Sequence, residues 1–135
     1  MNIMISLQGL GGFLIYFAAA IVAEALFVAL YMAVTPHNEA ELIKAGNAAA
    51  AISLAGAVLG FTLPLASAVT HSVSVLDMAV WSGVALIVQL AVFLVANIVL
   101  RDLSQRIEQG NIAAGITLAT ASFAIGILNA ASMTY

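Results

Sequence analysis

The sequence predicts an all-α fold, a polytopic transmembrane four-helix bundle made of two parallel two-helix repeats. The first observation is composition: of the 135 residues, 64% are hydrophobic and 7% are charged, whereas an average soluble domain carries about a quarter charged residues. The mean hydropathy is +1.18. The second observation is that four apolar runs of about 20 residues, each long enough to cross a ~30 Å hydrocarbon core as a helix, fit almost end to end. Little chain is left for a separate soluble domain.

The third observation is an internal match at a fixed offset of 64 residues, which indicates a duplication. We therefore divide the chain into a first two-span repeat, residues 1–68, and a second, residues 69–135. The matching positions of the first repeat, each identical to the residue 64 places later, are Ile43, Gly46, Asn47, Ala49, Ala50, Ile52, Leu54, Ala55 and Ala57.

Each predicted helix follows from an apolar run and its flanking residues. The first run has no basic segment before it, so we expect a true span rather than a signal peptide, and it ends before Pro36. Ser74 and Asp77 have the spacing of a capping box that opens the third helix. The predicted helices cover residues 12–34, 47–68, 75–100 and 111–132.

A Gly-Asn pair precedes the second helix of each repeat: Gly46 with Asn47, and Gly110 with Asn111. Glycine readily takes the left-handed conformation that ends a helical turn, and asparagine accepts a hydrogen bond from a backbone N–H at the start of the next helix. We favour this capping interpretation. The alternative, in which the paired asparagines line a cytoplasmic vestibule, stays open.

Small residues recur at four-residue spacing in the second and fourth predicted helices. Van der Waals packing is a main source of attraction between helices in lipid, and small residues allow the backbones to approach closely. We therefore expect these two helices to form the inner pair. The packing glycines are Gly56, Gly60, Gly115 and Gly126.

All Lys and Arg residues, Lys44, Arg101 and Arg106, lie in the connections between the first and second and between the third and fourth helices. The positive-inside rule places these connections in the cytoplasm and both termini outside. The formal charge of -3 argues against nucleic acid as a partner. The expected surroundings are the lipid bilayer.

The sequence offers little for catalysis, and we expect no enzyme, no metal and no cofactor. Cysteine is absent, which excludes disulfides and thiolate chemistry. His37 and His71 are expected on opposite sides of the membrane, each as a solvated loop residue rather than a metal ligand. The sequence shows no grouping of a nucleophile, a base and an orienting acid.

Glu24 lies near the middle of the first predicted helix, with no basic residue at that depth. Its counterpart at an offset of 65 residues is Gln89. A two-fold axis along the membrane normal would bring both side chains to nearly the same level, so we expect a hydrogen bond between them, with a neutral carboxyl as the donor. The other intramembrane polar candidates are Asn97, Ser122 and Asn129.

Polar contact between helices is the explanation that we favour for these residues. A hydrated path with Glu24 as a proton or cation site is the alternative.

The pattern Ile-x-x-Gly-Asn-x-Ala-Ala-x-Ile, which begins at Ile43 and again at Ile107, and the closing segment from Asn129 to Met133 resemble the YjfL-type bacterial inner-membrane proteins. The resemblance covers essentially the whole chain. It implies a multi-pass protein of the bacterial cytoplasmic membrane. The family is a domain of unknown function, so the resemblance transfers no reaction, cofactor or catalytic residue. Pro64 and Leu65 replace Leu128 and Asn129 of the second repeat, where the halves diverge.

Two functional hypotheses follow. The first is a non-enzymatic membrane module that acts by helix association, as a homo-oligomer or with a membrane or cytoplasmic protein partner. The second is a proton or cation pathway between subunits that uses Glu24 with Gln89. In the first hypothesis, charged residues of the short connections form the docking surface: Glu39, Glu41, Lys44, Arg101, Asp102, Arg106 and Glu108.

Overall fold

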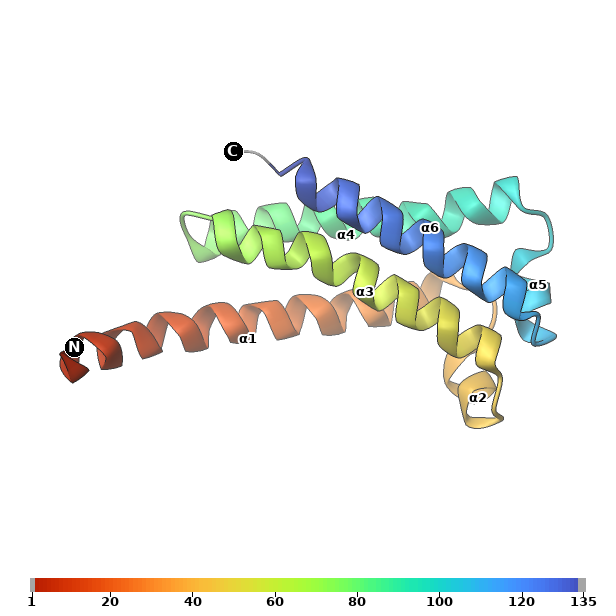
Figure 1. Ribbon diagram of the computed structural model, residues 1–135, viewed down its shortest axis with the longest axis horizontal. Coiled ribbons are helices and arrows are strands. Elements are labelled where there is room, and N and C mark those ends of the chain that lie inside the picture. The colour runs from red at the N-terminus through yellow and green to blue at the C-terminus, as the bar shows by residue number, and fades with distance from the viewer. Residues whose placement is uncertain (1, 134–135) are drawn as a thin grey trace.

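The computed structural model describes residues 2–133, and its regular elements in that range are all helices (Figure 1). Met1, Thr134 and Tyr135, at the ends of the two expected repeats, lie outside the described residues. The elements are α1 (Ile3–Val34), α2 (Glu39–Lys44), α3 (Ala48–His71), α4 (Val75–Val99), α5 (Leu103–Glu108) and α6 (Ile112–Ala131).

Four of these helices, α1, α3, α4 and α6, are long and apolar enough to cross a membrane. Their bounds follow the four predicted runs, with one correction: α1 begins at Ile3, and the predicted start at residue 12 is too late. The Asn2 side chain accepts a hydrogen bond from the Met4 N–H at 3.2 Å and caps the helix there. Gly12 and its neighbouring glycines lie inside α1 without ending it, as membrane helices tolerate glycine.

The inner pair consists of α3 and α6, which make the most extensive contact in the bundle and lie side by side in Figure 1. A Cβ added at any of four glycines would overlap the facing helix, so the two backbones approach too closely for larger residues. The facing pairs are Gly56 with Ala119, Gly60 with Ser122, Gly115 with Ala49 and Gly126 with Gly60.

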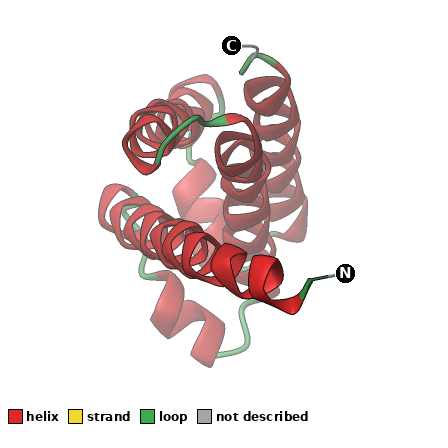
Figure 2. Cartoon of the chain, turned by 90° about the vertical axis from the view of Figure 1, so that its left-hand side faces the viewer, coloured by secondary structure: helices red, strands yellow, loops and turns green. Residues whose placement is uncertain are grey.

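The two short helices, α2 and α5, lie at one end of the bundle, and the α3–α4 connection lies with both ends of the chain at the other (Figure 1). Towards its N-terminus, α1 diverges from the other long helices (Figure 1), and Figure 2 views the chain from that end, with the start of α1 nearest the viewer. In the most apolar stretch of α1, 6% of the residues are buried, against 50% in that of α3. The packed core therefore lies around α3, and α1 covers it only with its C-terminal half.

The two halves have the same order of elements, long, short, long, and α2 and α5 begin 64 residues apart, at Glu39 and Leu103. The boundary expected after residue 68 falls inside α3, which continues to His71. The connection between the halves is therefore residues 72–74. That the halves are copies of one ancestral unit stays a prediction.

Candidate functional site

A buried polar cluster, which we define as Thr35, His37, Glu39 and Ser104, lies where the α1–α2 connection meets α5. His37 Nδ1 is 2.6 Å from Ser104 Oγ, and His37 Nε2 is 3.3 Å from Glu39 Oε1. The Thr35 hydroxyl donates to the same Glu39 oxygen at 2.5 Å. The exposed fractions are 6% for Thr35, 2% for His37, 0% for Glu39 and 7% for Ser104. The cluster therefore joins two connections that are 67 residues apart in sequence.

Several polar atoms in and beside the cluster lack a hydrogen-bond partner within residues 2–133. They are Glu39 Oε2, the Tyr31 hydroxyl and His37 Nε2. The contact of His37 Nε2 with Glu39 is close but is not aligned as a hydrogen bond. Phe93 borders the cluster, with its ring centroid 6.3 Å from that of His37 and 5.9 Å from that of Tyr31. Because an unpaired buried polar atom is costly, this region has unused capacity to bind a proton or a polar group.

The cluster overturns two expectations from the sequence. His37 is buried, so its assignment as a solvated loop residue is wrong. Glu39 is fully buried and cannot belong to an exposed docking surface. A serine, a histidine and an acid in one place were also not expected from the sequence, whereas Ser104, His37 and Glu39 lie together. His71 is exposed at the opposite end of the bundle, on the last turn of α3.

A polar pocket of about 510 Å³ opens beside the cluster, and Ser104 belongs to its wall. Its other lining residues are Pro36, Asn97, Arg101, Asp102, Gln105 and Glu108. Asn97, an expected intramembrane polar residue, is exposed here near the end of α4. Asp102 has φ of 62° and is the only non-glycine residue in the described range with a positive φ.

Glu24 does not pair with Gln89, and that expectation is wrong. Its Oε2 is 3.0 Å from the hydroxyl of Thr62 on α3, whereas its buried Oε1 has no hydrogen-bond partner among the described residues. Glu24 and Thr62 line an open groove of about 350 Å³ between α1 and α3. The carboxyl therefore lies at the edge of the bundle rather than between its halves.

Gln89 instead connects α4 to α6. Its Nε2 donates to the Ser122 carbonyl at 3.0 Å, and its Oε1 accepts from Asn129 Nδ2 at 3.3 Å. Gln89 and Ser122 are 2% and 3% exposed. Three of the expected polar residues thus form one network, which is distinct from Glu24.

Asn47 and Asn111 each cap the helix that follows. Asn47 Oδ1 accepts from the Ala50 N–H at 3.0 Å, and Asn111 Oδ1 accepts from the Ala114 N–H at 3.3 Å. The preceding glycines, Gly46 and Gly110, have φ of +86° and +79°, where a side chain would be strained.

The two asparagines differ in one respect. Asn47 Nδ2 also donates to the carbonyls of Ile107 at 2.8 Å and of Glu108 at 3.2 Å, and so binds the end of α5.

The comparisons with known proteins agree with this architecture. Residues 4–133 match the model of the family described as Domain of Unknown Function (DUF350). The chain belongs to this family. This DUF350 chain is 41% identical over 129 residues to the UPF0719 inner membrane protein YjfL of Escherichia coli strain K12, covering 96% of this chain and 98% of the relative. The same values hold for the protein of that name from Escherichia coli O157:H7. No solved structure matches the chain.

The name of these relatives, together with the four membrane-capable helices, supports a multi-pass inner membrane protein of unknown function. The family carries no enzymatic name. Within residues 2–133, no group of three or more His, Cys, Asp or Glu side chains is placed to hold a metal ion.

Proposed function

We propose that the chain is a homo-oligomeric membrane module whose subunits associate through the outer half of α1. The observation that carries this proposal is the length and exposure of α1. In this arrangement α2 and α5, with Lys44, Arg101 and Arg106 in and around them, face the cytoplasm, and both termini face outward.

The 32 residues of α1 form a helix about 48 Å long at a rise of 1.5 Å per residue, against a hydrocarbon core of ~30 Å. To bury this length by tilting alone, the helix needs a tilt of about 50°, beyond the usual range of roughly 0–40°. The cost of hydrophobic mismatch also drives some association between membrane helices. A second copy of the chain that covers the first turns of α1 removes the need for this tilt.

The surface of the outer half of α1 also suits helix association. Gly9, Gly11 and Gly12 have nothing within 4 Å of the position of an added Cβ, so their backbone is open to a neighbouring helix. Phe13 and Phe17 stack on each other with centroids 5.5 Å apart, and their side chains are 58% and 54% exposed. In lipid, open glycine surfaces of this kind favour close contact between helices.

Disulfide cross-linking tests the proposal, because the chain has no cysteine. Leu10→Cys places a thiol on the outer half of α1, where Leu10 is 49% exposed. The matched control is Leu128→Cys on the outer half of α6, where Leu128 is 61% exposed. We expect an oxidant to cross-link subunits through position 10 and not through position 128. Equal cross-linking at both positions, or a monomeric mass in lipid nanodiscs, would contradict the proposal.

A second candidate function, a proton or cation pathway between subunits, has support from the geometry of Glu24. The Thr62 hydroxyl lies 2.7 Å from the Val58 carbonyl and 3.0 Å from Glu24 Oε2, but it has only one hydrogen. Both bonds form together if Thr62 donates to Val58 and a protonated Glu24 donates to Thr62. The arrangement thus suits a carboxyl that holds a proton, and the groove beside it is open at the surface of the bundle.

Flux measurements in proteoliposomes distinguish this candidate from simple packing. If Glu24 carries protons or cations, Glu24→Gln removes flux and keeps the oligomer, since glutamine has the same shape. Glu24→Leu should remove flux and also lower thermal stability, because it leaves Thr62 without this partner. Unchanged flux in Glu24→Gln, with a destabilised Glu24→Leu, would eliminate the pathway and leave Glu24 as a packing residue.

A further inference from the structure

We propose that Ser104 is a nucleophilic serine that His37 activates and Glu39 orients, and that it attacks the carboxylic ester of an amphiphile at the end of the bundle that carries α2 and α5. All groups come from one chain, so the site does not depend on the proposed oligomer.

One hydrogen bond and one close contact between His37 and Glu39 define the role of each side chain. The Ser104 hydroxyl is 2.6 Å from His37 Nδ1, and it donates its hydrogen there when Nδ1 is unprotonated. The imidazole then carries its hydrogen on Nε2, which lies 3.3 Å from Glu39 Oε1. This order of hydroxyl, imidazole and carboxylate is the arrangement that activates a serine in triad enzymes, although the two ring nitrogens exchange places here.

The side chains of this arrangement are buried, so packing holds them in place. Glu39 and His37 are 0% and 2% exposed, and Thr35 fixes the carboxylate through its hydroxyl. The ring of Phe93 lies beside the imidazole in an edge-on arrangement, with centroids 6.3 Å apart. A positioned general base of this kind contributes about 10²–10⁴ in rate.

The chain contains a natural counterexample in Ser67 and His71 on α3. Ser67 Oγ is 3.3 Å from His71 Nδ1, but this nitrogen is also 2.9 Å from the Ser67 carbonyl. Ser67 is only partly buried and His71 is exposed. A serine beside a histidine thus occurs twice in the described residues, and at Ser104 the histidine is buried and contacts a buried glutamate.

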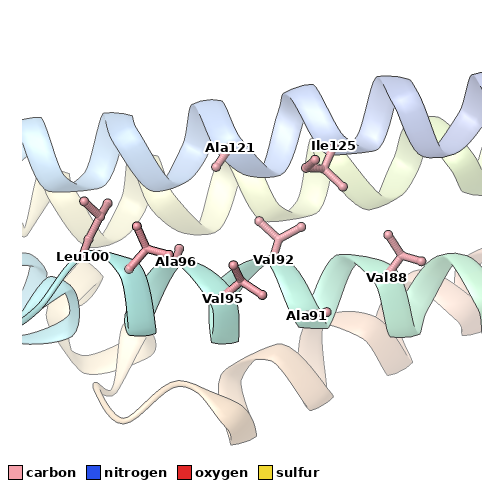
Figure 3. Close-up of a pocket in the computed structure, with 9 residues that line it drawn as sticks. Val88, Ala91, Val92, Val95, Ala96, Leu100, Ala121 and Ile125 are labelled. Atoms are coloured by element: carbon pink, nitrogen blue, oxygen red, sulfur yellow. The ribbon is translucent and has the colours of Figure 1, made fainter.

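The pockets around Ser104 indicate the class of substrate. Ser104 belongs to the wall of the 510 Å³ polar pocket, together with Asn97 and Arg101 near the end of α4. The same end of α4 borders an apolar groove of about 460 Å³ towards α6. Val92 and Ala96 of α4, Leu100 just after it and Ile125 of α6 line this groove (Figure 3). An amphiphile can place its polar ester in the polar pocket and its acyl chain along the apolar groove, so its two parts match the two surfaces.

The reaction is an acyl transfer to water. Ser104 Oγ attacks the ester carbonyl carbon, and the serine proton passes to His37 Nδ1. The carbon–oxygen bond to the alcohol then breaks, and the departing alkoxide takes the proton from His37. A water molecule attacks the acyl-serine by the same route, which releases the carboxylic acid and restores the Ser104 hydroxyl.

A fluorophosphonate probe tests the nucleophile directly in the full chain reconstituted in nanodiscs. The Ser104 oxygen forms a bond to phosphorus, the phosphorus–fluorine bond breaks, and the serine proton passes through His37 to solvent. Trypsin cleaves after Arg101 and Arg106, and the released peptide of residues 102–106 contains Ser104 as its single hydroxyl residue. We expect the mass of the adduct on this peptide.

Matched variants separate nucleophilic chemistry from folding. Ser104→Ala should abolish labelling, and Ser67→Ala should leave it unchanged. His37→Asn should slow it by about 10²–10⁴. Glu39→Gln should slow labelling and change its pH profile without loss of helix content, and Glu39→Asp should recover part of the rate.

Hydrolysis of p-nitrophenyl esters with short and long acyl chains reports the substrate class, and the proposal predicts faster turnover of the long-chain ester. Absence of the adduct from the 102–106 peptide of the folded wild-type protein would overturn the proposal. So would equal labelling of Ser104→Ala and wild type. Either result would leave the cluster as a clamp between the α1–α2 connection and α5.

Discussion

The contact between α3 and α6 makes a quantitative prediction for Gly126→Ala. The added Cβ would overlap the Cα, carbonyl carbon and carbonyl oxygen of Gly60. These are backbone atoms, so no side chain can rotate away, and the two helices must separate by on the order of 1 Å to reach ordinary contact distances of about 3.5–4.0 Å. A gap of 0.5–1 Å already removes roughly a quarter to a half of the dispersion energy of a contact.

Overpacking of this kind typically costs about 1–3 kcal/mol, and we expect Gly126→Ala to lower the free energy of unfolding by about 2 kcal/mol. The matched control is Gly83→Ala on α4, where an added Cβ meets nothing within 4 Å. That variant should differ from wild type by no more than about 0.5 kcal/mol.

Unfolding by SDS in mixed micelles, followed through the fluorescence of the single tryptophan, Trp81, gives both values. If Gly126→Ala proves as stable as Gly83→Ala, the two backbones do not approach as described, and the inner pair is incorrectly assigned.

The same unfolding assay checks three further predictions. Asn47→Ala should lower the free energy of unfolding by about 1 kcal/mol more than Asn111→Ala, because Asn47 also binds the end of α5. Equal losses would show that this link does not stabilise the fold. Asp102→Gly should raise stability by up to about 1 kcal/mol, since glycine accepts a φ of 62° without the left-handed penalty, and a loss would indicate that the Asp102 side chain has a role of its own. Gln89→Leu should lower the free energy of unfolding by about 0.6–1.7 kcal/mol, the range for hydrogen bonds between membrane helices. The reason is that it removes the bonds to Ser122 and Asn129. An unchanged stability would show that this network does not hold α4 to α6.

Most of the fold could be predicted because membrane helices follow from local patterns. The four apolar runs match α1, α3, α4 and α6, and the Gly-Asn pairs mark the starts of α3 and α6 because left-handed glycine and an asparagine cap are local requirements. The start of α1 was missed because three glycines indicate an interruption in water, whereas in lipid the backbone has no alternative hydrogen-bond partner.

The partner of Glu24 could not be predicted from its depth in the membrane alone. Equal depth suggested a contact with Gln89, but each of these side chains faces the second long helix of its own half. Glu24 contacts Thr62 on α3, and Gln89 contacts Ser122 on α6. Depth follows from position along the sequence, whereas the direction in which a side chain points depends on the rotation of the helix in the bundle.

The buried polar cluster was missed for a related reason. His37 and Ser104 lie in two short connections 67 residues apart, and neither connection contains a local pattern that indicates burial. Polar residues between two spans are ordinarily solvated, and here the packing of α5 and of Phe93 on α4 against the α1–α2 connection buries them.

The central claim of this account is that the chain crosses the membrane four times and keeps α2 and α5 on the same side. Single cysteines in the cysteine-free chain test it with an impermeant thiol reagent applied to sealed inverted and right-side-out vesicles. Glu41→Cys on α2 and Gln105→Cys on α5 should react only from the cytoplasmic side, and Val73→Cys, at a position that is 90% exposed in the α3–α4 connection, should react only from the opposite side. Reaction of positions 41 and 105 from opposite compartments would contradict the four-span bundle.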